Sequence, residues 1–310
     1  MRPHINVNYP QHFLKKIENF IRNRIGNHRG DSTLAEFFKE VEEYRAALDQ
    51  AYTNILGKKK AAKVLELDGY LLSPDLYFFK SSSLKNYTAY GFAAKENLLF
   101  YVVISLEEED KFKISSIGKI EGDLGILKTS PCFFFSRGII KKHAGELKKT
   151  SLPPYLTLWI HEYSHFIGYC LQKRPVAVAI SILYDHLAKE RDKGKGLTVR
   201  DLTNLIGNKR DEKAGEVART IIYLHSLDED MANFLEEIIL EEMGFNAGEY
   251  FSEKMKNSSF YPYFKKWGKQ RFVEYIEDWN NAEFQAPQFM KNFLKSLNRI
   301  EMERHPRGML

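Results

Sequence analysis

The segment Trp159–Gly168 reads WIHEYSHFIG and contains the pattern His-Glu-x-x-His. On a helix, His161 and His165 are four positions apart, so both imidazoles project from one face, about one turn apart. Two neutral imidazoles in this arrangement can bind one Zn²⁺ at ~2.0–2.1 Å. Glu162 follows the first histidine and could act on a water molecule without ligating the metal, as a general base must. The motif therefore predicts a hydrolytic zinc site whose metal lowers the pKa of that water to ~7.

The residues around the motif predict a buried helix from about Tyr155 to Gln172. Pro153-Pro154 precede this range, no proline interrupts it, and Pro175 marks its end or a sharp bend. Apolar residues lie on nearly all sides of the predicted helix, which is typical of a helix inside a domain. Without a metal, this helix would bury two imidazoles and a carboxylate at a considerable cost in free energy, so the pattern favours a metal site over coincidence.

The composition is that of a globular chain. Of its 310 residues, 44% are hydrophobic and 28% are charged, and no apolar run approaches the ~18 residues of a membrane span. The first residues lack the apolar core of a secretory signal, which predicts a cytoplasmic protein with no membrane partner and with Cys132 and Cys170 reduced. The net charge of +5 arises from 46 basic and 41 acidic residues in a well-mixed chain, so a nucleic-acid partner is not indicated.

The chain divides into a short helical segment and a larger mixed domain. Residues 1–60 predict an N-terminal helical hairpin, with amphipathic helices over 11–27 and 32–56. Residues 61–310 form the second predicted domain, which is β-rich over 61–150 and helical over 151–310. The strands that we expect are 76–79, 87–92, 98–104, 112–114 and 131–135, and the helices after the motif are 176–189, 198–206, 211–225 and 227–243.

A catalytic zinc usually has three protein ligands, so a third is expected outside the motif. The best candidate is Glu229, which opens the pattern Glu-x-x-Ala-Asn that ends at Asn233. This pattern resembles the second motif of the gluzincins, zinc peptidases in which a downstream glutamate completes His-Glu-x-x-His. The resemblance implies that Glu229 is a ligand and that Asn233 accepts the Nδ1 proton of His161. A ligand and its supporter four residues apart share one helix face.

Other roles remain open for these residues. Ser226-Leu227-Asp228-Glu229 is also a capping box, in which the glutamate only closes the start of a helix. Alternative third ligands are Glu236, Glu237, Asp185 and His186, and His225 is a further imidazole that we expect to be structural. Zinc peptidases often stabilise the oxyanion with a tyrosine or histidine, and the candidates for this role are Tyr250, Tyr261, Tyr263 and His225.

The sequence as a whole predicts a zincin-like α+β metalloendopeptidase. Zn²⁺ would be bound by His161, His165 and Glu229, and a metal-activated water, with Glu162 as general base, would hydrolyse the peptide bond. The expected partner is a peptide or protein substrate bound in extended form. The alternative is a non-catalytic regulatory or binding protein on a zincin scaffold, with a structural zinc and the N-terminal hairpin as its working surface. A structural site has no use for the base Glu162, which argues against this alternative.

Overall fold

The protein is described by a computed structural model. It describes residues 32–71, 77–80, 88–95, 98–105, 132–172, 199–207 and 211–277, together with positions 176, 179, 180, 183 and 187. The predicted helix 11–27 and strand 112–114 lie outside these residues, as does most of the predicted helix 176–189. No helix in the described part of the chain combines the length and the apolar character that crossing a bilayer requires.

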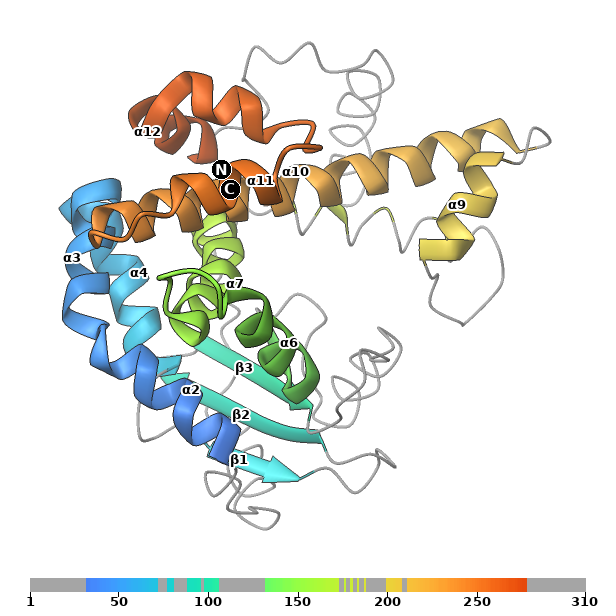
Figure 1. The fold of residues 1–310 in the computed structure, drawn as a ribbon. Coiled ribbons are helices and arrows are strands. Elements are labelled where there is room, and N and C mark those ends of the chain that lie inside the picture. The colour runs from blue at the N-terminus through green and yellow to red at the C-terminus, as the bar shows by residue number, and fades with distance from the viewer. Residues whose placement is uncertain are drawn as a thin grey trace, which may run out of the picture.

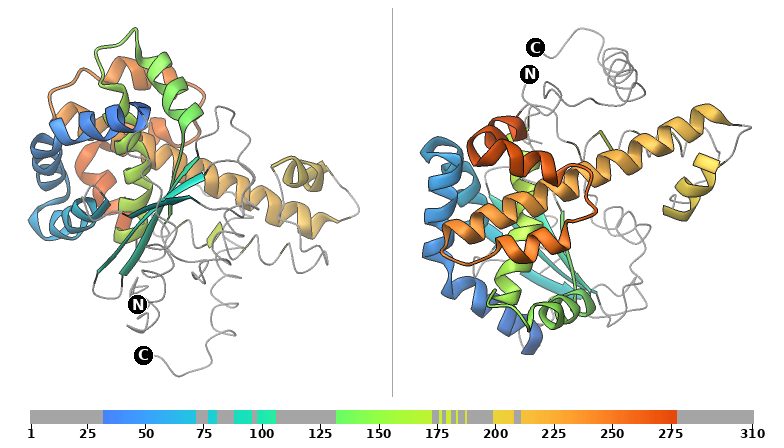
Figure 2. Two further views of the ribbon diagram at one scale, coloured as in Figure 1. Left: turned by 90° about the horizontal axis from the view of Figure 1, so that it is seen from below. Right: turned by 45° about the horizontal axis from the view of Figure 1, so that its top comes forward.

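The described side chains lie on nine helices, on the turns between them and at five further helical positions, 176, 179, 180, 183 and 187. Figure 1 shows the long helix α10 lying across α7, with α2, α3 and α4 along one side. The short helix α9 packs beside the first turns of α10, away from the other helices (Figure 2). The nine helices are α2 (Ser32–Glu43), α3 (Arg45–Leu56), α4 (Lys58–Leu71), α6 (Arg137–Leu147), α7 (Pro154–Leu171), α9 (Val199–Gly207), α10 (Glu212–Glu242), α11 (Gly248–Lys254) and α12 (Tyr261–Glu277).

A four-stranded sheet is described by its backbone and lies on the side of α7 opposite to α10 (Figure 1). Its order is β1-β2-β3-β4, and β4 pairs with β3 in parallel while the other pairs are antiparallel. The run of apolar residues in β3 suits an inner strand, and β3 is indeed paired on both sides. The strands are β1 (Tyr77–Lys80), β2 (Thr88–Lys95), β3 (Leu98–Ser105) and β4 (Cys132–Ser136).

Two parts of the chain before the motif differ from the sequence-based expectation. The helix predicted over 32–56 is two helices, α2 and α3, which are separated at Tyr44. The region predicted as β-rich from residue 61 begins with helix α4 and ends with helix α6. Gly57, with a φ of 76°, allows the turn from α3 into α4. Lys58–Lys60 form the first turn of α4, in which Lys58 and Lys59 are exposed.

Helix α7 carries the motif and is enclosed by other elements on several sides. It contacts α2, α4, α6, α10, α12 and β4. Trp159 and Tyr163 are buried on it and stack with ring centroids 5.8 Å apart, and the Tyr163 hydroxyl donates to the carbonyl of Val64 in α4. Glu40 of α2 accepts hydrogen bonds from the first free amides of α7, at Tyr155 (2.7 Å) and Leu156 (2.9 Å). The motif helix is therefore held at its start and along its apolar face.

Helix α10 is one continuous helix of 31 residues, where the sequence predicted two helices with a break near residue 226. The Asp211 carboxylate caps its start by accepting from the amide of Ala214. Ser226, which would begin the second helix, donates through its hydroxyl to the carbonyl of Ile222 one turn earlier. The predicted end is confirmed, since Gly244 follows the helix with a φ of 90°.

Candidate metal centre

His161 and His165 lie on the face of α7 that contacts α10. Their ring centroids are 5.1 Å apart and the ring planes are perpendicular. Both side chains are partly buried, with 15% and 23% of their surface exposed. The opposite side of α7 is occupied by the Trp159–Tyr163 stack, so packing of the apolar face turns the two imidazoles toward α10.

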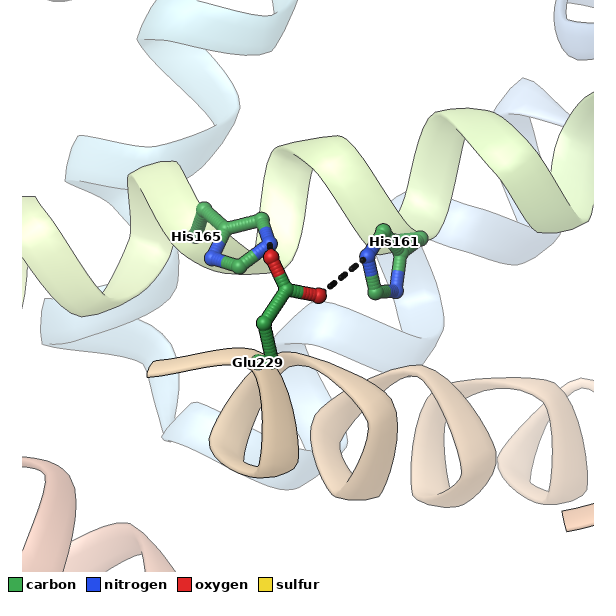
Figure 3. A group of neighbouring side chains, drawn as sticks. All are labelled: His161, His165 and Glu229. Atoms are coloured by element: carbon green, nitrogen blue, oxygen red, sulfur yellow. Dashed lines mark ion pairs between the residues drawn. The ribbon is translucent and has the colours of Figure 1, made fainter. Parts of the chain in front are cut away.

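Glu229 of α10 points between the two imidazoles (Figure 3). Its Oε2 lies 3.5 Å from Nε2 of His161, and its Oε1 lies 3.6 Å from Nε2 of His165. Because α10 is unbroken, Glu229 lies in the middle of a helix, and the capping-box interpretation is wrong. Its side chain is 56% exposed, so the centre opens to solvent on this side.

In each of the two histidines, the ring nitrogen that does not face Glu229, Nδ1, is hydrogen-bonded to a different carboxylate of α10. Nδ1 of His161 lies 3.0 Å from Oε2 of Glu236, and Nδ1 of His165 lies 2.9 Å from Oδ2 of Asp228. Hydrogen bonds of this kind orient a histidine so that Nε2 is the metal ligand. Asp228 was not predicted for any role, and its position beside Glu229 in the sequence was the only signal for it.

Asn233 does not have the predicted supporting role. Its side-chain amide donates to the backbone carbonyl of Glu229 at 2.7 Å, within α10. The partner of His161 is instead Glu236, which the sequence offered only as an alternative third ligand. The pattern Glu-x-x-Ala-Asn therefore locates the glutamate but not the residue that supports the histidine.

The remaining candidates lie elsewhere or outside the described residues. Glu237 is fully buried and accepts from the hydroxyl of Tyr261 (2.5 Å) and from Lys265 (2.7 Å), so it points away from the histidines. Tyr263 is exposed. His225 precedes Glu229 by one turn, and its pKa is lowered by burial despite the nearby Asp228 and Glu229. Asp185 and His186 lie outside the described residues.

Charges in the centre are strongly coupled. Burial alone would lower the pKa of His161, but hydrogen bonds to Glu229 and Glu236 outweigh it and raise the pKa to about 10. Burial would also lower the pKa of His165, but the charge of Asp228 and its hydrogen bond outweigh burial and raise this pKa to about 9. Without a metal, both imidazoles are therefore protonated at neutral pH and balance the surrounding carboxylates.

The carboxylates respond to the same surroundings. Burial would raise the pKa of Glu229, but the hydrogen bond with His161 and the charge of His165 lower it to about 2. Glu162 differs, because burial raises its pKa despite the two neighbouring histidines. A carboxylate with a raised pKa is suited to accepting a proton near neutral pH.

The donor set fits a divalent metal ion. His161, His165 and Glu229 each offer a ligand atom within 4.8 Å of the others, and in the described part of the chain only these three residues form such a group. Ligands at ~2.0–2.1 Å from a tetrahedral zinc lie about 3.4 Å from one another. Each Nε2 lies near that distance from one oxygen of the Glu229 carboxylate, at 3.5 Å from Oε2 for His161 and at 3.6 Å from Oε1 for His165. A dication would also replace the charge of the two imidazole protons.

Comparison of the chain with known protein families, with curated proteins and with solved structures finds no match. The interpretation of His161, His165 and Glu229 as a group that could hold a metal ion therefore rests on the geometry of this chain alone.

Proposed function

We propose that the protein is a zinc-dependent metallopeptidase in which His161, His165 and Glu229 bind the metal. One observation carries the proposal: both Nε2 atoms converge on the Glu229 carboxylate while both Nδ1 atoms are held by other carboxylates. This is the ligand set expected for a catalytic zinc with two histidines and one glutamate. We include in the same proposal that the protein has a zincin-like fold and belongs, among the zincins, to the gluzincins.

The chemistry of the site follows from the residues that surround it. Zinc, when bound, supplies a Lewis acid that polarises the scissile carbonyl and makes water more acidic. Glu162 takes the proton of the attacking water and delivers it to the leaving amine, which its raised pKa favours. Glu236 and Asp228 keep the two imidazoles in the orientation that presents Nε2.

Exposure of the centre supports a catalytic role over a structural one. Structural zinc sites are closed by four protein ligands, whereas a catalytic site keeps one position open. Only three ligating groups meet among the residues that the structure describes, and Glu229 is half exposed. A neighbouring strand also suits an extended substrate, since β4 contacts α7, is at the edge of the sheet among the described strands, and could pair with a peptide backbone.

The test is Glu162→Gln in the zinc-loaded protein. Hydrolysis of dye-labelled casein and of random-sequence decapeptides should fall about 10²–10⁴-fold, because the base is lost. Zinc content, measured by elemental analysis, should stay at that of the parent, because Glu162 is not in the group of ligands. Glu216→Gln is the matched control, since it makes the same change at an exposed position of α10.

Two outcomes would count against the proposal. Turnover that survives Glu162→Gln would refute the mechanism. A parent protein that binds zinc tightly but cleaves none of these probes would favour the regulatory or binding protein on a zincin scaffold.

A further inference from the structure

The Glu236 carboxylate belongs to the metal centre and is fully buried, so its charge has lost the solvation of water. Its Oε2 accepts from Nδ1 of His161 at 3.0 Å. Its Oε1 has no hydrogen-bond partner among the described residues. A buried carboxylate is strongly unfavourable unless an opposite charge lies close to it. One imidazole N–H compensates little of this cost, so a nearby cation is needed.

Lys254 lies at the end of the short helix α11, which packs against α10 (Figure 2). Its Nζ is 3.8 Å from Oε2 of Glu236, the same oxygen that faces Nδ1 of His161. This is the distance of an ion pair and is longer than a hydrogen bond. A carboxylate oxygen has two lone pairs and can face both groups. Lys254, Glu236 and His161 therefore form a row that leads from α11 to a proposed ligand of the metal.

Two aromatic rings of α11 define where the ammonium lies. Phe251 and Tyr250 come one turn before Lys254, and its Nζ is 5.1 Å from the ring centroid of Phe251 and 5.6 Å from that of Tyr250. Both distances are within the ~6 Å over which a ring attracts a cation. Phe251 is fully buried, so its ring is fixed by the core. The Lys254 side chain is 30% exposed, so solvent weakens its attraction to Glu236 without removing it.

The charge of Lys254 favours the ionised form of Glu236. Burial would raise the pKa of this carboxyl group, but the charge of Lys254, followed by the hydrogen bond and the charge of His161, outweighs burial and lowers the pKa. An ionised carboxylate has acceptors only, so it holds the proton of a neutral imidazole on Nδ1 and leaves Nε2 free to bind a metal. An ammonium beside Glu236 therefore bears on the orientation of the ligand atom.

We propose that Lys254 is a positioning residue of the metal centre, whose ammonium holds the buried Glu236 carboxylate where it accepts from Nδ1 of His161. This role rests on the proposed zinc site. It extends the centre by one helix, since Lys254 of α11 acts on Glu236 of α10, which in turn acts on His161 of α7. Lys254 is not in the group of candidate ligands and acts through Glu236.

The test measures zinc affinity in the full chain by competition with a chromophoric chelator. Lys254→Met removes the charge at nearly the same side-chain length and should weaken zinc binding about fivefold. This is less than the 10–100-fold effect of about one lost residue that bonds directly to a ligand, because Lys254 lies one residue further out and is partly solvated. Lys254→Arg keeps the charge and should bind zinc nearly as the parent does. In a Glu236→Gln background, Lys254→Met should have little further effect, because a neutral amide does not pair with the ammonium.

Lys265→Met is the matched control. It removes the ammonium that donates at 2.7 Å to Glu237, the adjacent buried carboxylate of α10. Its zinc affinity should equal that of the parent, because Glu237 faces α12 and not the histidines, whereas its resistance to urea should fall. Both substitutions remove a lysine beside a buried glutamate, so a general effect of that loss would appear in both.

Three results would overturn the role of Lys254. Zinc affinity in Lys254→Met equal to that of the parent would show that the ammonium does not act on the metal centre. Tighter zinc binding in this variant would mean that the ammonium repels the dication and does not act by holding Glu236. A loss in Lys254→Arg as large as in Lys254→Met, or an undiminished loss in the Glu236→Gln background, would exclude a charge that acts through Glu236.

A second variant covers a failure to fold. If Lys254→Met does not fold, as judged by circular dichroism, Lys254→Gln takes its place, and equal zinc affinity of Lys254→Gln and Lys254→Arg overturns the role. A parent that binds no zinc would refute both this role and the proposed function. Zinc binding without peptide hydrolysis would refute only the proposed function, and hydrolysis with unchanged zinc affinity in Lys254→Met would refute only the role of Lys254.

Discussion

Glu236 and Glu237 are consecutive residues of α10 with fully buried side chains, and they face different neighbours. Glu237 faces α12, where the Tyr261 hydroxyl and the Lys265 ammonium donate to it. Glu236 faces α7, where its partner is an imidazole. On the α12 side the buried charge is compensated by a lysine, and the contact ties two helices together.

On the α7 side, the acidic groups outnumber the permanent cations. Glu162, Asp228, Glu229 and Glu236 surround the two histidines, and Lys254 is the cation near Glu236. Without a metal, protons on the imidazoles supply the missing charge. A buried carboxylate with a close lysine partner holds helices together, whereas a cluster of several carboxylates balanced by one lysine and by exchangeable protons can accept a dication.

The largest effect on zinc affinity is expected from removal of the Glu229 carboxylate, which lies between the two imidazoles. Glu229→Ala should weaken zinc binding by more than about 100-fold. Loss of a residue that only hydrogen-bonds to a metal ligand already reduces metal affinity about 10–100-fold, and loss of a ligand itself should cost more. The thermal stability of the metal-free protein should also fall, because Glu229 pairs with both imidazoles, and solvent at its half-exposed side chain makes this loss smaller. Elemental analysis after dialysis measures the zinc, and retention of one zinc per chain in this variant would exclude Glu229 as a ligand.

Matched changes at the two adjacent glutamates should separate affinity from stability. Glu236→Gln should weaken zinc binding about 10–100-fold, since it alters the partner of His161. Glu237→Gln should leave zinc affinity unchanged and reduce the free energy of unfolding by about 1–3 kcal/mol. The lower part of that range is expected, because Lys265 is 42% exposed and its charge is screened by solvent.

Chelator titration and urea unfolding measure the two quantities in each variant. A loss of zinc affinity in Glu237→Gln comparable to that in Glu236→Gln would mean that the two sides of α10 are not independent.

The smallest effect is a pH dependence of the metal-free protein. The pKa values of His161 and His165 are raised to about 10 and 9, so the stability that they contribute is fully present below ~6.5 and is lost as the pH rises toward these values. The lowered pKa of Glu229 has no influence in this range, since its contribution is complete above ~4.5.

We therefore expect the Tm of the chelator-treated protein to fall by a few degrees between pH 6.5 and 9. With excess zinc this fall should be absent, because the metal takes the place of the protons and binds more tightly as they leave. Scanning calorimetry with and without zinc checks the difference, and a constant gap in Tm across this range would contradict the coupling of protons and metal.

All three residues of the candidate metal-binding group could be predicted from the sequence, whereas the carboxylates that hold the histidines could not. The motif helix was predicted over 155–172 and is α7, and the two histidines and Glu229 meet as expected. The predicted supporter Asn233 was wrong because its choice relied on spacing within one helix. The histidines pair with α10 in reverse order, His161 with Glu236 and His165 with Asp228, so the supporters depend on how the two helices cross.

The predicted break between two helices near residue 226 was wrong because tertiary packing outweighs the local capping pattern there. A capping pattern at Ser226 suggested a helix start, but α10 continues through it because residues on both sides of that point are buried against other helices. The division into domains 1–60 and 61–310 remains a prediction, and α4 and α6 show that helices also occur in the range predicted as β-rich.

The sequence by itself determined that two imidazoles share one helix face with a glutamate between them, because the 3.6-residue period of a helix sets such local spacing. The tertiary structure alone decided which carboxylates hold the imidazoles and that Glu237 turns toward a lysine. These relations join residues up to 75 positions apart, as His161 and Glu236 are, and no local period specifies them. They follow from the packing of α6, α7, α10 and α12 around buried charges that must each find a partner.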